Sequence, residues 1–224
     1  MRHIKIDWLR AFTHAAALAP LALLIWDYTQ DQLSVNPIQD ITARTGRTAL
    51  TLLVLSLACT PANTLFGFKR ALTVRRALGL YAFLYAGLHF LTFIGLDYGF
   101  DLGLIGATIA EKRYVLVGFA AFLILLPLAI TSTRGWMKRM GKKWKLLHRF
   151  GYLAALLAIV HFVWLVKSDI REPVRFGIVV VVLLALRLPH LRKAISRFRS
   201  RLKGPVNLPR PRPRSGDPQL GAGL

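Results

Sequence analysis

The sequence predicts an all-α integral membrane protein, a bundle of six transmembrane helices with both the N- and C-termini in the cytoplasm. First, 54% of the 224 residues are hydrophobic and the mean hydropathy is +0.46, which is too apolar for a water-soluble fold. Second, six apolar runs can be separated, and most have the roughly 20 residues that a helix needs to cross a bilayer. Third, most basic residues lie between and after these runs.

The six expected spans are residues 9–28, 46–65, 76–96, 114–132, 148–166 and 174–188. The backbone finds no water in the hydrocarbon of a bilayer, so each span must be a helix. The first run is long enough to span and lacks a clear cleavage site, so we expect it to be retained. The last run is short and carries Arg175 and Arg187 near its ends, where both side chains can reach the interface. We assign no internal repeat.

The charges of the connecting segments predict the orientation of the helices. Lys and Arg accumulate on the cytoplasmic side, and here they cluster near the N-terminus, in residues 69–76 and 134–145, and in the tail. The alternate loops hold acidic residues with few offsetting bases, so both termini are expected in the cytoplasm. We therefore expect a transmembrane domain, residues 1–190, and a basic, proline-rich, disordered cytoplasmic tail, residues 191–224.

Charge and cysteine content argue against several functional classes. A net charge of +21 would suggest nucleic-acid binding in a soluble protein, but these bases follow membrane topology, so no nucleic-acid partner is expected. The one cysteine, Cys59, excludes an internal disulfide, a CxxCH haem attachment and a cysteine-ligated iron–sulfur cluster on this chain. No acidic residue lies deep in a span, whereas proton pumps and cation transporters usually need one.

Four histidines within or at the ends of apolar spans are the candidate functional residues: His14, His89, His148 and His161. Each could instead be a neutral imidazole that is hydrogen-bonded to a neighbouring helix. His89 lies thirteen residues after Arg76, and His161 lies thirteen after His148. Both are therefore roughly 20 Å from the cytoplasmic entrance of helices that run in the same direction. Two imidazoles at one depth predict bis-histidine ligation of a b-type haem.

A second haem would require His148 and a further ligand. The span that carries His89 has Arg75 and Arg76 at its entrance instead of a histidine. His14, on the cytoplasmic half of the first span, is a candidate partner for His148. Alternatively, His148 is an interfacial histidine among basic neighbours. The candidate apolar rim of the haem, whose members would equally serve helix packing, consists of Leu84, Tyr85, Leu88, Phe90, Phe93, Phe162 and Val163.

The chain resembles the MsrQ (YedZ) family over about residues 8–188, in the stretches NPIQDITARTG, RRALGLYAFLYAGLHF, LLPLAITSTRG and GKKWKLLHRFGYLAALLAIVHFVWLVKSD. Members of this family are haem-binding membrane subunits of bacterial periplasmic methionine sulfoxide reductase systems, within the ferric-reductase-like transmembrane group. The resemblance implies a multi-pass cytochrome b of the bacterial inner membrane, with one or two b-type haems. It would pass electrons from quinones to a periplasmic, molybdopterin-containing reductase of the MsrP type, which repairs methionine sulfoxide in proteins.

The resemblance also implies which residues form the site. The haem-ligand histidines of the family carry over onto His89, His148 and His161. The family is associated with flavin mononucleotide (FMN), and Arg75 and Arg76 are candidate contacts for FMN or quinone. The chain would be the electron-transfer subunit of a two-component reductase rather than the subunit that reduces the substrate. Two alternatives remain: a haem-dependent ferric or other metal reductase core, and a membrane transporter or scaffold with structural histidines.

Overall fold

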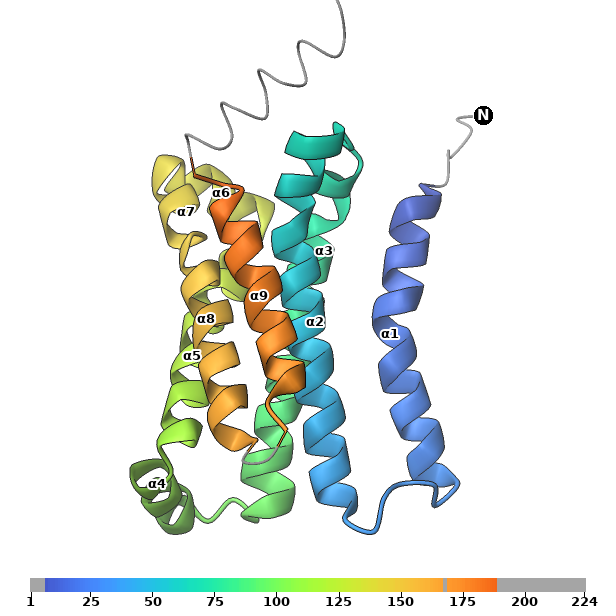
Figure 1. The fold of residues 1–224 in the computed structure, drawn as a ribbon, viewed down its shortest axis with the longest axis vertical. Coiled ribbons are helices and arrows are strands. Elements are labelled where there is room, and N and C mark those ends of the chain that lie inside the picture. Colours follow the sequence, from blue (N-terminus) through green and yellow to red (C-terminus); the bar gives the residue numbers. More distant parts are fainter. Residues whose placement is uncertain (1–6, 167–168, 189–224) are drawn as a thin grey trace, which may run out of the picture.

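The computed structural model describes residues 7–166 and 169–188, which form helices joined by short turns (Figure 1). Long segments run back and forth along one axis: α1 (Trp8–Thr29), α2 (Pro37–Phe66), α3 (Ala71–Leu91), α5 (Arg113–Ile130), α8 (Phe150–Leu165) and α9 (Arg171–Ala185). Shorter helices lie at the two ends of the bundle: α4 (Leu102–Glu111), α6 (Arg134–Met140) and α7 (Lys142–Leu147). No strand occurs in these residues, so the all-α prediction is confirmed for them.

Within the described residues, five helical segments are long and apolar enough to cross a bilayer. They are α1, α2, α3 together with the π-helix η1 (Thr92–Asp97), α5, and α7 together with α8. These segments indicate a multi-pass membrane protein. The sixth expected span corresponds to α9, whose 15 residues are fewer than the roughly 20 that a perpendicular crossing needs. The expected tail, residues 191–224, lies outside the described residues.

The helix α2 begins well before the expected span, at Pro37 rather than at residue 46. The side chain of Asn36 caps it by accepting a hydrogen bond from the backbone N–H of Gln39 at 3.1 Å. Pro37 occupies the first turn, where the missing backbone donor costs nothing. The polar stretch that precedes the apolar run is therefore helical. Its cap provides a hydrogen-bond acceptor for a backbone N–H group that has no partner within the first helical turn.

An ion-pair network holds this polar end of α2. Arg44 forms a 2.9 Å ion pair with Asp40 on the same helix and a second ion pair with Asp27 at the end of α1. Arg47 joins α2 to α9 through Glu172, with a 2.6 Å contact between Nε and Oε1. Two arginines of α2 thus pair with three of the acidic residues at this end, Asp27, Asp40 and Glu172.

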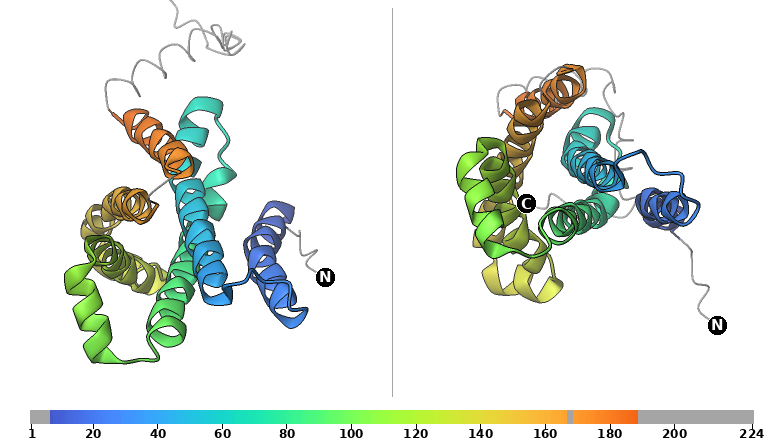
Figure 2. Two further views of the ribbon diagram at one scale, coloured as in Figure 1. Left: turned by 60° about the horizontal axis from the view of Figure 1, so that its bottom comes forward. Right: turned by 90° about the horizontal axis from the view of Figure 1, so that it is seen from below.

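The helices form two closely packed pairs, α2 with α3 and α5 with α8, and α9 packs against α8 and α2 (Figure 2). α1 lies on the outside of the bundle, beside α2 and α3. Tyr85 of α3, which is 1% exposed, joins it to the bundle. The Tyr85 hydroxyl donates to the carbonyl of Ala17 at 2.8 Å and accepts from the N–H of Leu21 at 3.0 Å. This clamp lies beside Pro20, at the point where the helical ladder of α1 is interrupted.

Candidate functional site

His89 and His161 face each other from α3 and α8. Their ring centroids are 6.1 Å apart and the ring planes are inclined by 85°. A metal that is bound at about 2 Å by each imidazole nitrogen places the two ring centres roughly 6 Å apart. The two helices therefore hold the imidazoles at a spacing that would fit two nitrogen ligands of one metal ion.

Each of these imidazoles uses its Nδ1 atom to bind a backbone carbonyl of a neighbouring helix. His89 Nδ1 lies 2.9 Å from the carbonyl oxygen of Thr42, and His161 Nδ1 lies 2.6 Å from that of Tyr114. A carbonyl oxygen can only accept, so Nδ1 carries the proton in both rings. The lone pair is therefore on Nε2, where it can bind iron. A hydrogen bond from the other ring nitrogen is the usual support of a metal-bound histidine.

Two glycines make room for the histidine rings. A Cβ atom added at Gly46 would lie 2.9 Å from Nδ1 of His89, and one added at Gly118 would lie 2.6 Å from Nδ1 of His161. Real Cβ atoms essentially never approach another heavy atom so closely. Each glycine lies one helical turn after the residue whose carbonyl binds the ring. The absence of a side chain thus allows each imidazole to reach the backbone of the adjacent helix.

The two half-sites repeat the same sequence spacing. In both, the histidine lies 47 residues after the residue whose carbonyl it binds. Each member of the second set follows its counterpart by 72 positions, and a further pair of close contacts, Gly79 with Ser56 and Gly151 with Leu128, keeps this offset. The α2–α3 and α5–α8 pairs are therefore structural counterparts, a correspondence that we did not assign from the sequence. The matched positions are Thr42 and Tyr114, Gly46 and Gly118, and His89 and His161.

His148 has a different environment, at the opposite end of α8 where α7 ends. Its ring lies against that of Trp144, with centroids 4.0 Å apart and planes tilted by 30°, and its Nε2 lies 3.3 Å from the hydroxyl of Thr131. That hydroxyl donates to the carbonyl of Pro127 at 2.6 Å, so it accepts from His148. The counterpart of His148 at the 72-residue offset is Arg76. The structure therefore does not place a second histidine at the matching position.

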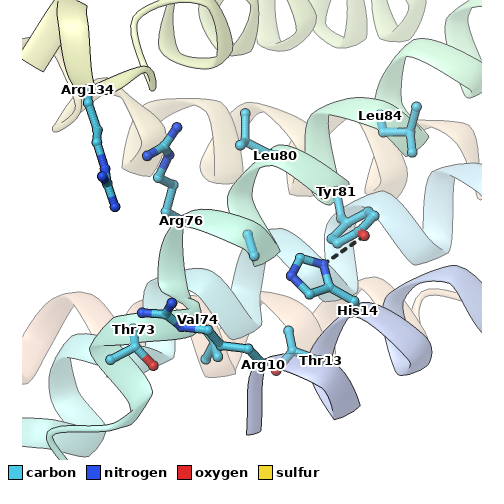
Figure 3. A pocket seen from close by; sticks show the side chains of 11 residues that line it. Arg10, Thr13, His14, Thr73, Val74, Arg76, Leu80, Tyr81, Leu84 and Arg134 are labelled. Atoms are coloured by element: carbon cyan, nitrogen blue, oxygen red, sulfur yellow. Dashed lines mark hydrogen bonds between the residues drawn. The ribbon is translucent and has the colours of Figure 1, made fainter. Parts of the chain in front are cut away.

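The structure does not bring His14 beside His148. Instead, the Nδ1 atom of His14 lies 2.9 Å from the hydroxyl of Tyr81, and both residues line a pocket between α1 and α3 (Figure 3). Arg76 lines the same pocket. Arg75 has a different partner, because its guanidinium donates to the hydroxyl of Thr60 at 3.2 Å. The two adjacent arginines therefore have separate environments.

The expected apolar rim is only partly placed around the two histidines. Tyr85 binds the backbone of α1, and Leu84 lines the pocket between α1 and α3, so both face away from the pair. Phe90 stacks on Phe119 and Phe122 of α5, with centroids 5.7 and 4.9 Å apart. The residues that pack against the buried core of the bundle are Leu88, Phe162 and Val163.

Sequence reasoning missed the residues that orient the imidazoles. These are Gly46 and Gly118 and the carbonyls of Thr42 and Tyr114. A glycine 43 residues before each histidine is the sequence signal that could have identified them. The described residues contain no group of three or more His, Cys, Asp or Glu side chains that could hold a metal ion. A haem needs only the two axial nitrogens.

Comparison with known proteins finds close relatives over most of the chain. A family described as the ferric reductase like transmembrane component matches residues 45–159. The protein-methionine-sulfoxide reductase heme-binding subunit MsrQ of Xanthomonas axonopodis pv. citri is 46% identical over 185 residues, which cover 80% of this chain and 85% of the relative. MsrQ of Xanthomonas campestris pv. campestris (strain 8004) is 46% identical over 193 residues (84% and 88%). MsrQ of Rhodospirillum rubrum is 44% identical over 186 residues (82% and 89%).

Proposed function

The chain belongs to the MsrQ family of ferric-reductase-like transmembrane proteins, and from this premise we propose that it is a membrane cytochrome b that binds haem through His89 and His161. One observation supports this proposal above all: two imidazoles 6.1 Å apart, each with Nδ1 bound to a backbone carbonyl. The bound haem would supply one-electron oxidation and reduction. The chain would supply the two axial nitrogens, their orientation and the apolar surroundings that set the potential.

The direction of electron flow that fits this arrangement is from the membrane to the outside of the cell. Quinol, with or without an intermediate flavin, would be the donor, and a periplasmic molybdopterin-containing reductase of the MsrP type would be the acceptor. His89 and His161 are near the C-terminal ends of α3 and α8. These helix ends lie toward the end of the bundle that holds α4, opposite to the end with α6 and α7 (Figure 1). If the basic end is cytoplasmic in a bacterial inner membrane, the haem lies on the periplasmic side, where electrons must leave.

The surface near this exit includes carboxylates that no arginine neutralises. Asp27 and Asp40 are paired with Arg44, and the carboxylate of Asp101 caps the start of α4. Glu172 is paired with Arg47, and Asp169 accepts a hydrogen bond from the backbone N–H of Arg171. The other three acidic side chains at this end of the described chain, Asp31, Asp97 and Glu111, form no ion pair within it. These three residues are the candidate contacts for a positively charged patch on the partner reductase.

A second haem at the other end would use His148, as the family resemblance implies. We keep His14 as the candidate partner, although in the structure its Nδ1 binds Tyr81. The haem-to-protein ratio tests this directly. Two haems in the wild type and one in His148→Ala support a second site, whereas an unchanged ratio in His148→Ala refutes a ligand role for this residue.

The match to a ferric reductase like family favours one alternative function. In this alternative, the haem of this chain reduces metal ions directly, without a partner reductase. Reduction of ferric chelates by the purified chain, at a rate that a periplasmic reductase does not change, would favour this alternative. We expect slow ferric reduction and fast transfer to the periplasmic reductase instead.

The function is tested by reconstituting the haem-loaded protein in liposomes and adding quinol. We expect reduction of the haem, visible as the α band, and its reoxidation when the periplasmic reductase and methionine sulfoxide are added together. The reductase with methionine sulfoxide but without this chain should consume no quinol. A purified protein that lacks a Soret band after expression with sufficient haem would overturn the cytochrome proposal.

A further inference from the structure

The aromatic ring of Tyr114 lies against the imidazole of His161. Their ring centroids are 6.0 Å apart and the ring planes are inclined by 48°. Tyr114 is the second residue of α5, which begins at the α4 end of the bundle. It is therefore one helical turn closer to that end than Gly118, the glycine that makes room for the same imidazole. The half-buried ring of Tyr114 thus extends from His161 toward the end where electrons are proposed to leave.

The other half-site has a different side chain at the matching position. The counterpart of Tyr114 at the 72-residue offset is Thr42, whose hydroxyl donates to the carbonyl of Ile38 at 2.7 Å. Both residues hold an imidazole through their backbone carbonyls. The ring of Tyr114 is therefore not needed to hold His161, and its contact with the imidazole calls for a separate role.

The surface next to Tyr114 contains a second tyrosine and a lysine. Lys112, at the junction of α4 and α5, is exposed and donates a hydrogen bond to the hydroxyl of Tyr98. Charge interactions with Tyr98, the largest effect, and with Tyr114 raise the pKa of Lys112, so this side chain is positively charged at neutral pH. Tyr98 packs against Phe93, with ring centroids 4.7 Å apart. The interactions thus run from His161 through Tyr114 to an exposed side chain.

We propose that the ring of Tyr114 is the contact through which electrons leave the haem held by His161, and that the oxidant docks over Tyr98, Lys112 and Tyr114. A protein controls electron transfer from a cofactor by how closely it brings the acceptor to it. One electron passes from the reduced haem iron to the oxidant, so the iron is oxidised and the acceptor is reduced. No bond forms or breaks, and Tyr114 keeps its hydroxyl proton. This inference rests on the proposed function, of which it identifies the exit surface.

The exit contact is tested by oxidising the reduced, haem-loaded protein in nanodiscs with hexaammineruthenium(III). This one-electron acceptor is a cation, which suits a surface where Asp97 and Glu111 are the sequence neighbours of Tyr98 and Lys112. Stopped-flow absorbance gives the rate for wild type, Tyr114→Leu, Tyr114→Phe and Tyr28→Leu. We expect Tyr114→Leu, which removes the ring, to slow oxidation by about tenfold or more, because a small loss of proximity has a large effect on rate.

Tyr114→Phe keeps the ring and should retain the wild-type rate. Tyr28→Leu is the matched control, because Tyr28 is an exposed tyrosine at the end of α1. The carbonyl that binds His161 belongs to the backbone, so both substitutions of Tyr114 preserve it. Slower oxidation of Tyr114→Leu at an unchanged midpoint potential supports the exit contact. Three results would overturn it: the rate of Tyr28→Leu in Tyr114→Leu, equal slowing in Tyr114→Phe, or a slower rate that a shifted midpoint potential accounts for.

The docking surface is tested without electron transfer, by acetylating the lysines of the oxidised protein with and without a periplasmic molybdopterin-containing reductase. Mass spectrometry compares Lys112 with Lys138, which is exposed on α6 at the opposite end of the bundle. We expect the reductase to reduce the acetylation of Lys112 and to leave that of Lys138 unchanged. Protection of Lys138 instead of Lys112 overturns the docking surface. If neither lysine is protected while Tyr114→Leu still slows oxidation, the exit contact is supported and the partner in the proposed function is contradicted.

Discussion

In both His89 and His161, the two ring nitrogens have different roles. Nδ1 binds a carbonyl of the adjacent helix and fixes the ring, and Nε2 remains available for iron. Because Gly46 and Gly118 permit this contact, the orientation of the two imidazole rings depends on two residues that have no side chain. The residues that hold a metal ligand in place can thus be as important as the ligand.

We predict that Gly46→Ala and Gly118→Ala each displace a histidine ring, because the added Cβ would lie within 3 Å of its Nδ1 atom. Loss of such support for a metal ligand typically costs about 10- to 100-fold in affinity. Haem content after purification and the midpoint potential from redox titration measure the effect. Gly87→Ala is the control, since nothing lies within 4 Å of a Cβ added there on the same helix as His89. Equal values for all three variants would contradict the positioning role.

The sequence alone predicted that His89 and His161 lie at the same depth, because depth can be counted in residues along a helix, and the structure places their rings 6.1 Å apart. It could not predict which way a ring points, because thirteen residues fix a height but not the neighbour that the ring contacts. Tyr85 shows the same limit. Its position suggested a place at the haem rim, but its hydroxyl has partners on α1, which no spacing along α3 could reveal.

At the scale of the elements, the attachment of α1 depends on a small number of polar contacts. The hydroxyl of Tyr85 donates a hydrogen bond to the carbonyl of Ala17 at 2.8 Å and accepts one from the N–H of Leu21 at 3.0 Å, and so links α3 to the backbone of α1. Many residues of α1 are exposed, including Trp8, Phe12 and Leu23, as expected for a helix whose other faces contact lipid.

Tyr85→Phe removes this link, and we expect it to lower the free energy of unfolding by about 1 to 3 kcal/mol, the cost of leaving a buried backbone group without its partner. Thermal unfolding in detergent measures the change. Tyr28→Phe serves as the control, because Tyr28 is 63% exposed at the end of α1 and should have almost no effect. A Tyr85→Phe protein as stable as the control would show that this link does not contribute to holding α1.

The ion pair between Arg47 and Glu172 joins α9 to α2, but its side chains are 52% and 38% exposed. Screening by solvent limits such a pair to roughly 0.2–1 kcal/mol. A double-mutant cycle with Arg47→Gln and Glu172→Gln should therefore give a coupling free energy below about 1 kcal/mol that falls as salt is added. A larger coupling that does not depend on salt would show that the pair is shielded in the membrane.

The boundaries of the elements were predictable only where hydrophobicity decides them. The expected first and fourth spans agree closely with α1 and α5, whereas α2 begins nine residues before its expected start because a cap and arginine ion pairs stabilise a polar turn. The short helices α4, α6 and α7 were not expected. α6 and α7 lie in a basic connecting segment without an apolar run, whereas α4 is apolar but, with 10 residues, is too short to be recognised as a span.

At the scale of the whole molecule, the repeated relation between α2–α3 and α5–α8 explains why His89 and His161 face each other. Each pair presents one histidine from its second helix, supported by the first helix. The sequence indicated that His89 and His161 lie at equivalent depths. It did not reveal the repeat of the two helix pairs, because most positions that are related by the 72-residue offset hold different residues. At His148 the match is with Arg76, which explains why the basic end does not repeat the arrangement at His89 and His161.

The positions of the two termini relative to the membrane show whether α9 forms a sixth crossing. Six crossings place both termini on the same side, whereas five place them on opposite sides. We predict that a reporter that is active only in the cytoplasm is active when fused after residue 188 and at the N-terminus, and inactive when inserted between α3 and α4. Activity at only one terminus would show that α9 does not cross.

The central claim is that His89 and His161 bind the same haem, and the absorption spectrum of the purified protein tests it most directly. The reduced-minus-oxidised spectrum and the haem-to-protein ratio are compared for wild type, His89→Ala, His161→Ala and His14→Ala. We predict that His89→Ala and His161→Ala each abolish the same haem signal, and that this signal persists in His14→Ala. Retention of the signal in both His89→Ala and His161→Ala, or loss of a different haem in each, would contradict the claim.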